Sequence, residues 1–432
     1  ACLAVLMLTA GACSGSGPEA SPPEPTAPPA TATAVAQATP SGPDDIEPAP
    51  LTAPYRGVTE SSIKIGVAIA DTNLFAPQGD LAPRIAALAA ATNAAGGING
   101  RTIEIVTETW GLLDQTGFYT ACTRLTEDEE VFLVIGFLIA NWGDVGCYTN
   151  LHETVVLNST VPKEDEIAAG AGRQITTEPS ELALLLDGLA EMAGEITGQN
   201  IVLFAVQAGS DSVARATEKL IEIGAASVSA TTQQVGGAEN LVAAQAELDI
   251  HIERWRADGS DMIIALDGNA AVGLLPALER AGMTDIPVVT PTIDLPTLTA
   301  LGADLSATNL IGIGAPSFDS LAVAGLYDIA DCIDIVTAAT GETIVPNVAK
   351  GEVDGLATTI RGCAAWDIFV AGATAAGPTL TEQSFLEALY GLGEYDQTGS
   401  VSGSVSTTKF HSSNAQAELH VWDADRGQFI LR

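Results

Sequence analysis

The sequence predicts an α/β protein made of two lobes with parallel sheets that are joined by a hinge. Three observations lead to this prediction. From residue 62 onwards, short β-branched runs alternate with longer segments that have helical spacing. The alternation forms two consecutive series that meet near residue 180. The chain has 432 residues and is 47% hydrophobic, which is enough for more than one packed domain.

The first series starts with a β-branched strand and an Ala-rich helix, and Gly96 and Gly97 stop that helix. The strands expected in this series are 63–70, 103–107, 131–136 and 155–157. The helices expected between them are 81–95, 118–125 and 142–151. Strands that alternate with helices form right-handed βαβ units, so we expect a parallel sheet that is covered on both faces.

The second series repeats this pattern. Its expected strands are 201–206, 227–231, 262–266, 288–289 and 310–313, and its expected helices are 212–223, 241–257 and 270–281. Further helices are expected at about 319–340, 352–376 and 382–391. The tail 417–431 alternates as a hairpin, with Asp425, Arg426 and Gly427 at its turn. Open parallel sheets bind ligands beyond the carboxyl ends of their strands, so two such lobes predict a binding cleft that closes by hinge motion.

The N-terminal residues predict export and a membrane tether. Residues 3–12 form an apolar run that is too short to span a bilayer but has the length of a signal-peptide core. The segment from Leu8 to Cys13 resembles a bacterial lipobox, with Ala10 where Leu is usual. We therefore expect residues 1–12 to be a truncated signal peptide. Cys13 would carry the lipid that anchors the protein to the outer face of the cell membrane. The alternative is a cysteine that follows an ordinary signal peptide.

A Pro-rich linker is expected over residues 13–61. Eleven of the chain's 22 prolines lie in residues 14–61, and Tyr55 is the only aromatic residue there. Such a segment cannot bury enough apolar surface to fold. We expect it to hold the folded part away from the membrane.

Charge and motifs exclude several classes of function. The chain has 17 basic and 54 acidic residues, which gives a net charge of −37. This charge repels phosphate backbones, so a nucleic-acid partner is not expected. The sequence has no Gly-x-Ser-x-Gly elbow, no P-loop, no His-Glu-x-x-His and no dinucleotide glycine motif after a strand. We expect no enzyme, no cofactor and no metal site.

Four cysteines lie in the expected globular part: Cys122, Cys147, Cys332 and Cys363. They permit three pairings, and proximity in the sequence favours Cys122 with Cys147 and Cys332 with Cys363. Export makes disulfides the expectation, and four buried thiols are the alternative.

The stretch NAAGGINGR at 93–101 carries a resemblance to a known family. Together with the strands at 63–67 and 103–106, it resembles the leucine/isoleucine/valine-binding (type I) periplasmic binding proteins, the substrate-binding lipoproteins of ABC transporters. The resemblance implies two Rossmann-like lobes with parallel sheets joined by three crossings. Lobe 1 would comprise residues 62–180 with 310–395, and lobe 2 residues 181–309 with 396–432.

The resemblance also implies a function. A small-molecule solute, an amino acid or a related, more apolar compound, would bind in the interlobe cleft of a monomer and be delivered to an ABC permease in the membrane. Family members with a first-lobe disulfide place its cysteines where Cys122 and Cys147 stand. A sensing receptor of the same fold is the first alternative function, and an enzyme is the second.

The loops after the strands supply the expected ligand-binding residues. The family's loop after the third strand carries two serines, but here the loop from Gly136 to Trp142 has none, which puts α-amino-acid specificity in doubt. The ligand-binding residues expected are Asp71, Thr72, Trp110, Phe137, Leu138, Ile139, Ala140, Trp142, Ser159, Gln207, Asp267 and Asn269. Phe137 and Trp142 could equally pack against the loop. Asp267 could pair with a ligand ammonium or cap the following helix.

Overall fold

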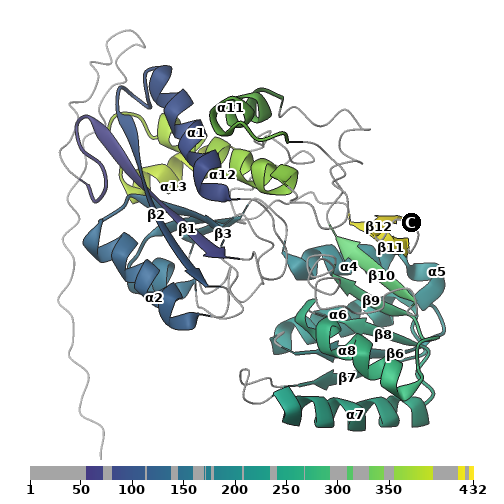
Figure 1. Cartoon of the computed structure of the whole chain (residues 1–432). Coiled ribbons are helices and arrows are strands. Elements are labelled where there is room, and N and C mark those ends of the chain that lie inside the picture. Colours follow the sequence, from purple (N-terminus) through teal and green to yellow (C-terminus); the bar gives the residue numbers. More distant parts are fainter. Residues whose placement is uncertain are drawn as a thin grey trace, which may run out of the picture. The chain divides into compact units, whose positions relative to one another are not determined.

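The computed structural model of the protein contains two sheets, each with helices on its two faces (Figure 1). The structure describes residues 55–71, 80–111, 114–137, 145–158, 170, 172–176, 180–206, 209–233, 241–266, 268–291, 309–314, 330–344, 355–392, 417–423 and 428–432.

The first sheet has five parallel strands in the order β2-β1-β3-β4-β5. Their bounds are β1 Ser62–Asp71, β2 Thr102–Gly111, β3 Leu133–Phe137, β4 Val155–Asn158 and β5 Gln174–Thr176. All four residues of β4 are buried, as expected for a central strand that is covered on both faces.

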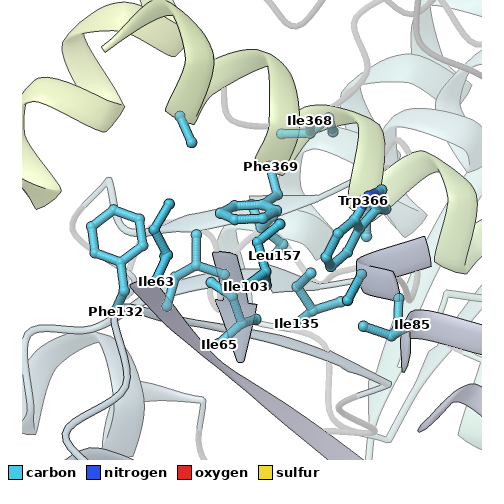
Figure 2. Close-up of a cluster of buried hydrophobic side chains, with 14 of the residues drawn as sticks. Ile63, Ile65, Ile85, Ile103, Phe132, Ile135, Leu157, Trp366, Ile368 and Phe369 are labelled. Carbon is cyan, nitrogen blue, oxygen red and sulfur yellow. The ribbon is translucent and has the colours of Figure 1, made fainter. Parts of the chain in front are cut away.

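Helices cover both faces of this sheet. On one face lie α1 (Leu81–Ala94), α12 (Gly355–Ala375) and α13 (Glu382–Gly391), and α11 (Ala330–Thr340) packs on α1. Figure 2 shows Trp366 and Phe369 of α12 lying over strand residues such as Ile65 and Leu157. The other face carries α2 (Gln115–Thr123) and two π-helical turns, η1 (Arg124–Asp128) and η2 (Cys147–Leu151).

The second sheet has seven strands in the order β12-β11-β10-β9-β8-β6-β7. The parallel strands are β6 Asn200–Ala205, β7 Ser227–Thr232, β8 Met262–Ala265, β9 Val288–Pro291 and β10 Leu310–Gly314. The tail forms the predicted hairpin, because β11 (Glu418–Asp423) pairs antiparallel with β10 and with β12 (Gln428–Leu431). The expected turn residues of this hairpin lie outside the described residues.

Two layers of helices enclose the second sheet as well. The helices α4 (Glu181–Glu191), α5 (Ala193–Ile196) and α6 (Ser210–Ile223) share one core with it. The helices α7 (Leu241–Ala257) and α8 (Gly268–Ala281) share the other. Each sheet therefore lies within its own α/β lobe, as predicted from the two series of strands and helices.

Strand pairing corrects one expected lobe boundary. Lobe 1 was expected to resume at residue 310, but β10 is hydrogen-bonded between β9 and β11 in the second sheet. The chain therefore leaves the second lobe only after Gly314. The short strand β5 and the helices α4 and α5 were not predicted from the sequence. The helix expected over 142–151 is a single π-helical turn at its described end, from Cys147 to Leu151.

The expected end of the linker at residue 61 is also wrong. Val58 is only 4% exposed, and isolated bridges join it to Tyr55 and to Ile63. Arg56 donates to the carbonyl oxygen of His152 over 2.8 Å. Gly57 has φ +71°, and a Cβ there would lie 2.1 Å from the backbone nitrogen of Phe132. This tight approach fixes the chain to the first lobe from Tyr55 onwards.

Both disulfides favoured by proximity are present. Cys122 is bonded to Cys147, and Cys332 to Cys363, with Cα–Cα distances of 6.5 and 6.2 Å. They join α2 to η2 and α11 to α12. Among the described helices, none combines the length and the apolar character that a membrane crossing requires.

Candidate functional site

The carboxyl ends of the first sheet's strands lie at one edge, where the parallel register aligns several expected site residues. Asp71 ends β1 and is paired with Gly111, and Trp110 is paired with Ala70. Phe137 ends β3 beside Ile69. The structure thus brings the backbones of Asp71, Trp110 and Phe137 to one edge, where an open parallel sheet binds its ligand. Thr72 and the side chain of Phe137 lie outside the described residues.

The side chain of Trp110 is part of the core and not of an open surface. Only 6% of Trp110 is exposed. Its ring meets Phe118 edge to face at 5.3 Å between centroids, and Phe118 meets Tyr148 in the same way at 5.9 Å. In this arrangement Trp110 holds α2 against the sheet, so its contact with a ligand remains a prediction.

The loop after β3 was expected to supply most of the first-lobe contacts. Leu138, Ile139, Ala140 and Trp142 lie outside the described residues. The structure describes the residues on either side of this loop. Phe137, before it, belongs to β3, and Cys147, after it, is bonded to Cys122 of α2. Three residues that bracket the far end, Val145, Cys147 and Tyr148, are buried in the same core as Trp110.

The fourth strand ends in a fully buried asparagine. Asn158 is 0% exposed and is paired with Gly136 and Thr176 in the two neighbouring strands. The side chain of Asn158 is therefore enclosed at the carboxyl end of β4. Ser159, which was expected to contact the ligand, directly follows Asn158 but lies outside the described residues.

The second sheet has a corresponding carboxyl edge, at which β6, β8 and β9 end in Ala205, Ala265 and Pro291. Gln207 and Asp267 follow two of these strands and lie outside the described residues. Asn269 is the second residue of α8, and its side chain is not described. Whether Asp267 caps α8 or pairs with a ligand therefore stays a prediction.

A buried histidine lies near the same edge, on a strand that the sequence did not associate with the site. His420 of β11 is paired with Gly312, is 7% exposed, and its Nε2 is 3.9 Å from a carboxylate oxygen of Glu418. Burial lowers the pKa of His420 below 6.5, and the charge of Glu418 opposes this shift in part. Burial therefore favours the neutral form of His420.

Sequence reasoning also missed a buried arginine at the carboxyl edge of the first sheet. Arg84 lies in α1, which follows β1 in the chain, and is 0% exposed. Its Nη2 is 2.5 Å from Glu342 Oε2, and its Nε donates to Thr359 Oγ1 over 2.9 Å. The signal that could have revealed it is its position among Leu81, Ile85 and Leu88, where the helical period predicts apolar residues.

One group of three potential metal ligands occurs within the described part of the chain: Cys122, Cys147 and His152, whose ligand atoms lie within 4.8 Å of one another. The two sulfur atoms are bonded to each other, and a disulfide does not present the thiolates that bind zinc. With the disulfide formed, the geometry serves to fix η2 against α2.

A comparison of the chain with known protein families agrees with the two-lobe architecture. A model of the family described as periplasmic binding protein matches residues 62–426, which is most of the chain. The chain belongs to the periplasmic binding protein family. No curated protein matches this periplasmic binding protein.

Solved structures share the fold at low sequence identity. A type 1 periplasmic binding protein from Bordetella pertussis Tohama I is 16% identical, with a TM-score of 0.63, over 86% of this chain and 100% of that one. A leucine-binding protein from Thermotoga maritima is 12% identical, with a TM-score of 0.61, over 86% and 97%. A fatty acid ABC transporter substrate-binding protein from Thermomonospora curvata is 14% identical, with a TM-score of 0.57, over 87% and 92%. This periplasmic binding protein therefore has the type I fold.

Proposed function

We propose that this periplasmic binding protein is the solute receptor of an ABC importer. It would bind a small molecule at the carboxyl edges of its two sheets and deliver it to a membrane permease, without catalysis. The observation that carries the proposal is the family match over 62–426 together with two sheets, one parallel and one parallel except for its terminal hairpin. In such sheets the loops after the strands form the binding site.

The class of solute follows from the loop after β3. This loop, Gly136 to Trp142, reads Gly-Phe-Leu-Ile-Ala-Asn-Trp and offers no hydroxyl group for a carboxylate. Backbone N–H groups remain available for an anion, and the side chains favour an apolar body. We propose a solute with a small polar head and an apolar part, such as a branched or aromatic amino acid or a fatty acid. Leucine and fatty acid appear in the names of two proteins with this fold.

The N-terminal residues support a tether. The apolar run at 3–12, the lipobox-like segment ending at Cys13 and the prolines that follow favour export and lipid attachment. We propose that Cys13 carries the anchor, that residues 14–54 form the linker, and that the receptor works as a monomer at the outer face of the membrane. Mass spectrometry of the full-length protein from a bacterial membrane fraction tests this: the N-terminal peptide should begin at a diacylated Cys13, and a Cys13→Ala variant should appear in the soluble fraction.

The binding proposal is tested by thermal melting of residues 55–432, refolded from denaturant to remove carried-over solute. The panel holds L-leucine, L-phenylalanine, L-glutamate, L-arginine, urea, benzoate and palmitate. A solute present at about 100 times its dissociation constant should add ~2.7 kcal/mol of stability and raise the melting temperature. A rise with leucine, phenylalanine or palmitate supports the proposal. A rise only with glutamate or arginine would contradict the apolar site, and no rise with any solute would contradict solute capture.

A sensing receptor is the competing function. Both receptors bind a solute, but only an importer's receptor stimulates its permease. Uptake of the radiolabelled solute in cells that express the chain with its permease distinguishes them, because a sensor would leave uptake unchanged.

A further inference from the structure

Arg84 is a charged side chain on a buried face of α1. It lies between Leu81 and Ile85, both of which are also fully enclosed. A guanidinium is costly to bury unless its charge and its N–H groups find partners. The partners it finds determine what Arg84 can do.

The guanidinium joins three separate segments of the first lobe. Its Nη1 donates to the carbonyl oxygen of Asp80 over 2.5 Å, and Asp80 is the N-cap of α1. Its Nε donates to Thr359 Oγ1 of α12 over 2.9 Å. Its Nη2 donates to Glu342 Oε2 over 2.5 Å, in the segment that follows α11. One side chain therefore joins the start of α1 to α12 and to the segment that follows α11.

The sequence of α12 makes room for this arrangement. A Cβ on Gly355 would lie 3.0 Å from Arg84 Nη2, and a Cβ on Gly362 would lie 3.0 Å from a methyl group of Leu81. Between these glycines, the hydroxyl of Thr359 donates to the Gly355 carbonyl over 2.6 Å, which leaves its oxygen free to accept from Arg84. The three positions lie on one face of the helix, since they are spaced by four and three residues.

The segment held by Glu342 follows α11, which is the first described element of lobe 1 after β10 of lobe 2. Strand β10 ends in the second sheet at Gly314, and α11 begins at Ala330 and packs on α1. Among the residues of α11, only Val336 is buried. Besides the packing of partly buried residues such as Ile335, two cross-links hold this part of the chain: the Cys332–Cys363 disulfide and, just after α11, the Arg84–Glu342 pair.

We propose that Arg84 is a positioning residue that couples α11, at the root of this crossing, to the first turn of α1 at the carboxyl edge of the first sheet. Under the proposed function, hinge motion between the lobes would act on α11, and the solute would bind at the carboxyl edge. The Arg84–Glu342 pair thus links the two events. The inference rests on the proposed function for its consequence in solute binding, whereas the coupling itself can be measured without a solute.

The coupling is tested by hydrogen–deuterium exchange of the full chain carrying Glu342→Gln, with Glu129→Gln as the matched control. Both glutamate side chains are 44% exposed and pair with one cation, Arg84 and Lys64 respectively. We expect amides 84–88 of α1 and those of α11 to exchange at least about fivefold faster in Glu342→Gln, with β3 and β4 unchanged. Glu342→Asp, which keeps the carboxylate, should restore part of the protection.

Two exchange results would overturn the coupling. One is protection of 84–88 in Glu342→Gln equal to that in Glu129→Gln. The other is a loss of protection that is equal in β3 and β4, because it would reflect general destabilisation.

A second experiment measures the affinity of the same variants for L-leucine, L-phenylalanine and palmitate. Where the wild type binds one of these probes, Glu342→Gln should weaken its affinity about threefold or more while Glu129→Gln leaves it unchanged. Equal affinities in the two variants would overturn the positioning role. If the wild type binds none of the probes, the proposed function fails for these solutes, and the exchange experiment still decides the coupling.

Discussion

The hydroxyl group of Tyr55 donates a hydrogen bond over 3.2 Å to Glu382 Oε2, although the two residues are 327 positions apart. The other oxygen of Glu382 accepts from Arg173 Nε over 2.6 Å. The Tyr55 ring also meets Phe132, just before β3, edge to face at 6.1 Å. Tyr55 is thereby joined to α13, through Glu382 to the segment before β5, and to the residue that precedes β3.

The Tyr55 contacts should contribute measurably to stability. We expect Tyr55→Phe, which keeps the ring and removes one hydrogen bond, to lower the free energy of unfolding by about 1 kcal/mol. Tyr55→Ala also removes the ring contact and should cost about 3 kcal/mol. Urea unfolding of residues 55–432 measures both values. Tyr119→Phe, at a site that is 39% exposed, is the control and should be neutral. A wild-type midpoint for Tyr55→Ala would show that the contact contributes nothing.

The contacts of Tyr55 also show which part of the fold could not be predicted from the sequence. The periodic, β-branched and Ala-rich segments were sufficient to predict two lobes, most of the strands and the terminal hairpin. The linker end was misplaced because residues 55–61 are mostly polar and have no periodic apolar run that would indicate a helix or a strand. Their order comes from contacts with Phe132, His152 and Glu382, which are far away in the sequence. Such contacts have no local signature.

For the candidate site, the sequence predicted only which strand ends lie together. Loop position alone placed Asp71, Trp110 and Phe137 at one edge, and the parallel register agrees. Side-chain direction was not predictable in the same way. Trp110 faces α2 because the period of the strand places it on the same face as Ala68 and Ala70, in the core with Phe118. Arg84 was missed because a charged residue on an apolar face violates the pattern used to find cores.

The buried hydroxyl group of Tyr148 should not be needed for the stability of the fold. The residue is 0% exposed, and within the described part of the chain its oxygen has no hydrogen-bond partner. Burial, with a smaller effect of the Glu108 carboxylate, raises the pKa of Tyr148 above its usual value of 10. Tyr148→Phe removes an unsatisfied polar group and keeps the contact with Phe118. We therefore expect it to be neutral or to stabilise the fold by up to about 1 kcal/mol.

Tyr390→Phe is the contrasting variant for this prediction. The Tyr390 hydroxyl donates to the carbonyl oxygen of Gly172 over 3.2 Å, so its removal should destabilise the chain by about 1 kcal/mol. Denaturant unfolding of the two variants under the same conditions compares them directly. Equal losses of stability in both would mean that the Tyr148 hydroxyl has a partner after all.

His420 should make the fold less stable in mild acid. Its burial lowers the pKa in the folded state below the value of about 6.5 in the unfolded chain. A group with a lowered pKa binds fewer protons in the folded than in the unfolded state. Its contribution to stability is therefore complete above pH 6.5 and is lost as the pH falls through the lowered pKa.

Carboxylates also titrate in acid, so a variant is needed to isolate the histidine. We expect the loss in free energy of unfolding between pH 7.5 and pH 5.5 to be smaller for His420→Gln than for the wild type. Urea unfolding at the two pH values measures it. His152→Gln, which removes an imidazole from the first lobe, controls for the substitution itself. If His420→Gln and the wild type lose the same free energy over this range, burial of His420 does not couple folding to pH.

The acidic surface should make stability rise with salt. With a net charge of −37, repulsion among carboxylates opposes the compact state. The Debye length falls from ~30 Å at 0.01 M salt to ~3 Å at 1 M, so salt screens this repulsion. Salt also weakens exposed ion pairs such as Arg256–Glu253, but pairs of this kind are worth about 0–1 kcal/mol each. Repulsion should therefore dominate, and the melting temperature should rise by several degrees between these salt concentrations.

Calorimetry in sodium chloride and in tetramethylammonium chloride separates screening from specific cation binding. Screening depends on ionic strength alone, so both salts should raise the melting temperature equally. A rise in sodium chloride only would indicate carboxylates that coordinate sodium, since the large organic cation cannot replace a small ion bound by oxygen ligands. A constant or falling melting temperature in both salts would mean that the 17 basic residues neutralise the surface locally in spite of the net charge.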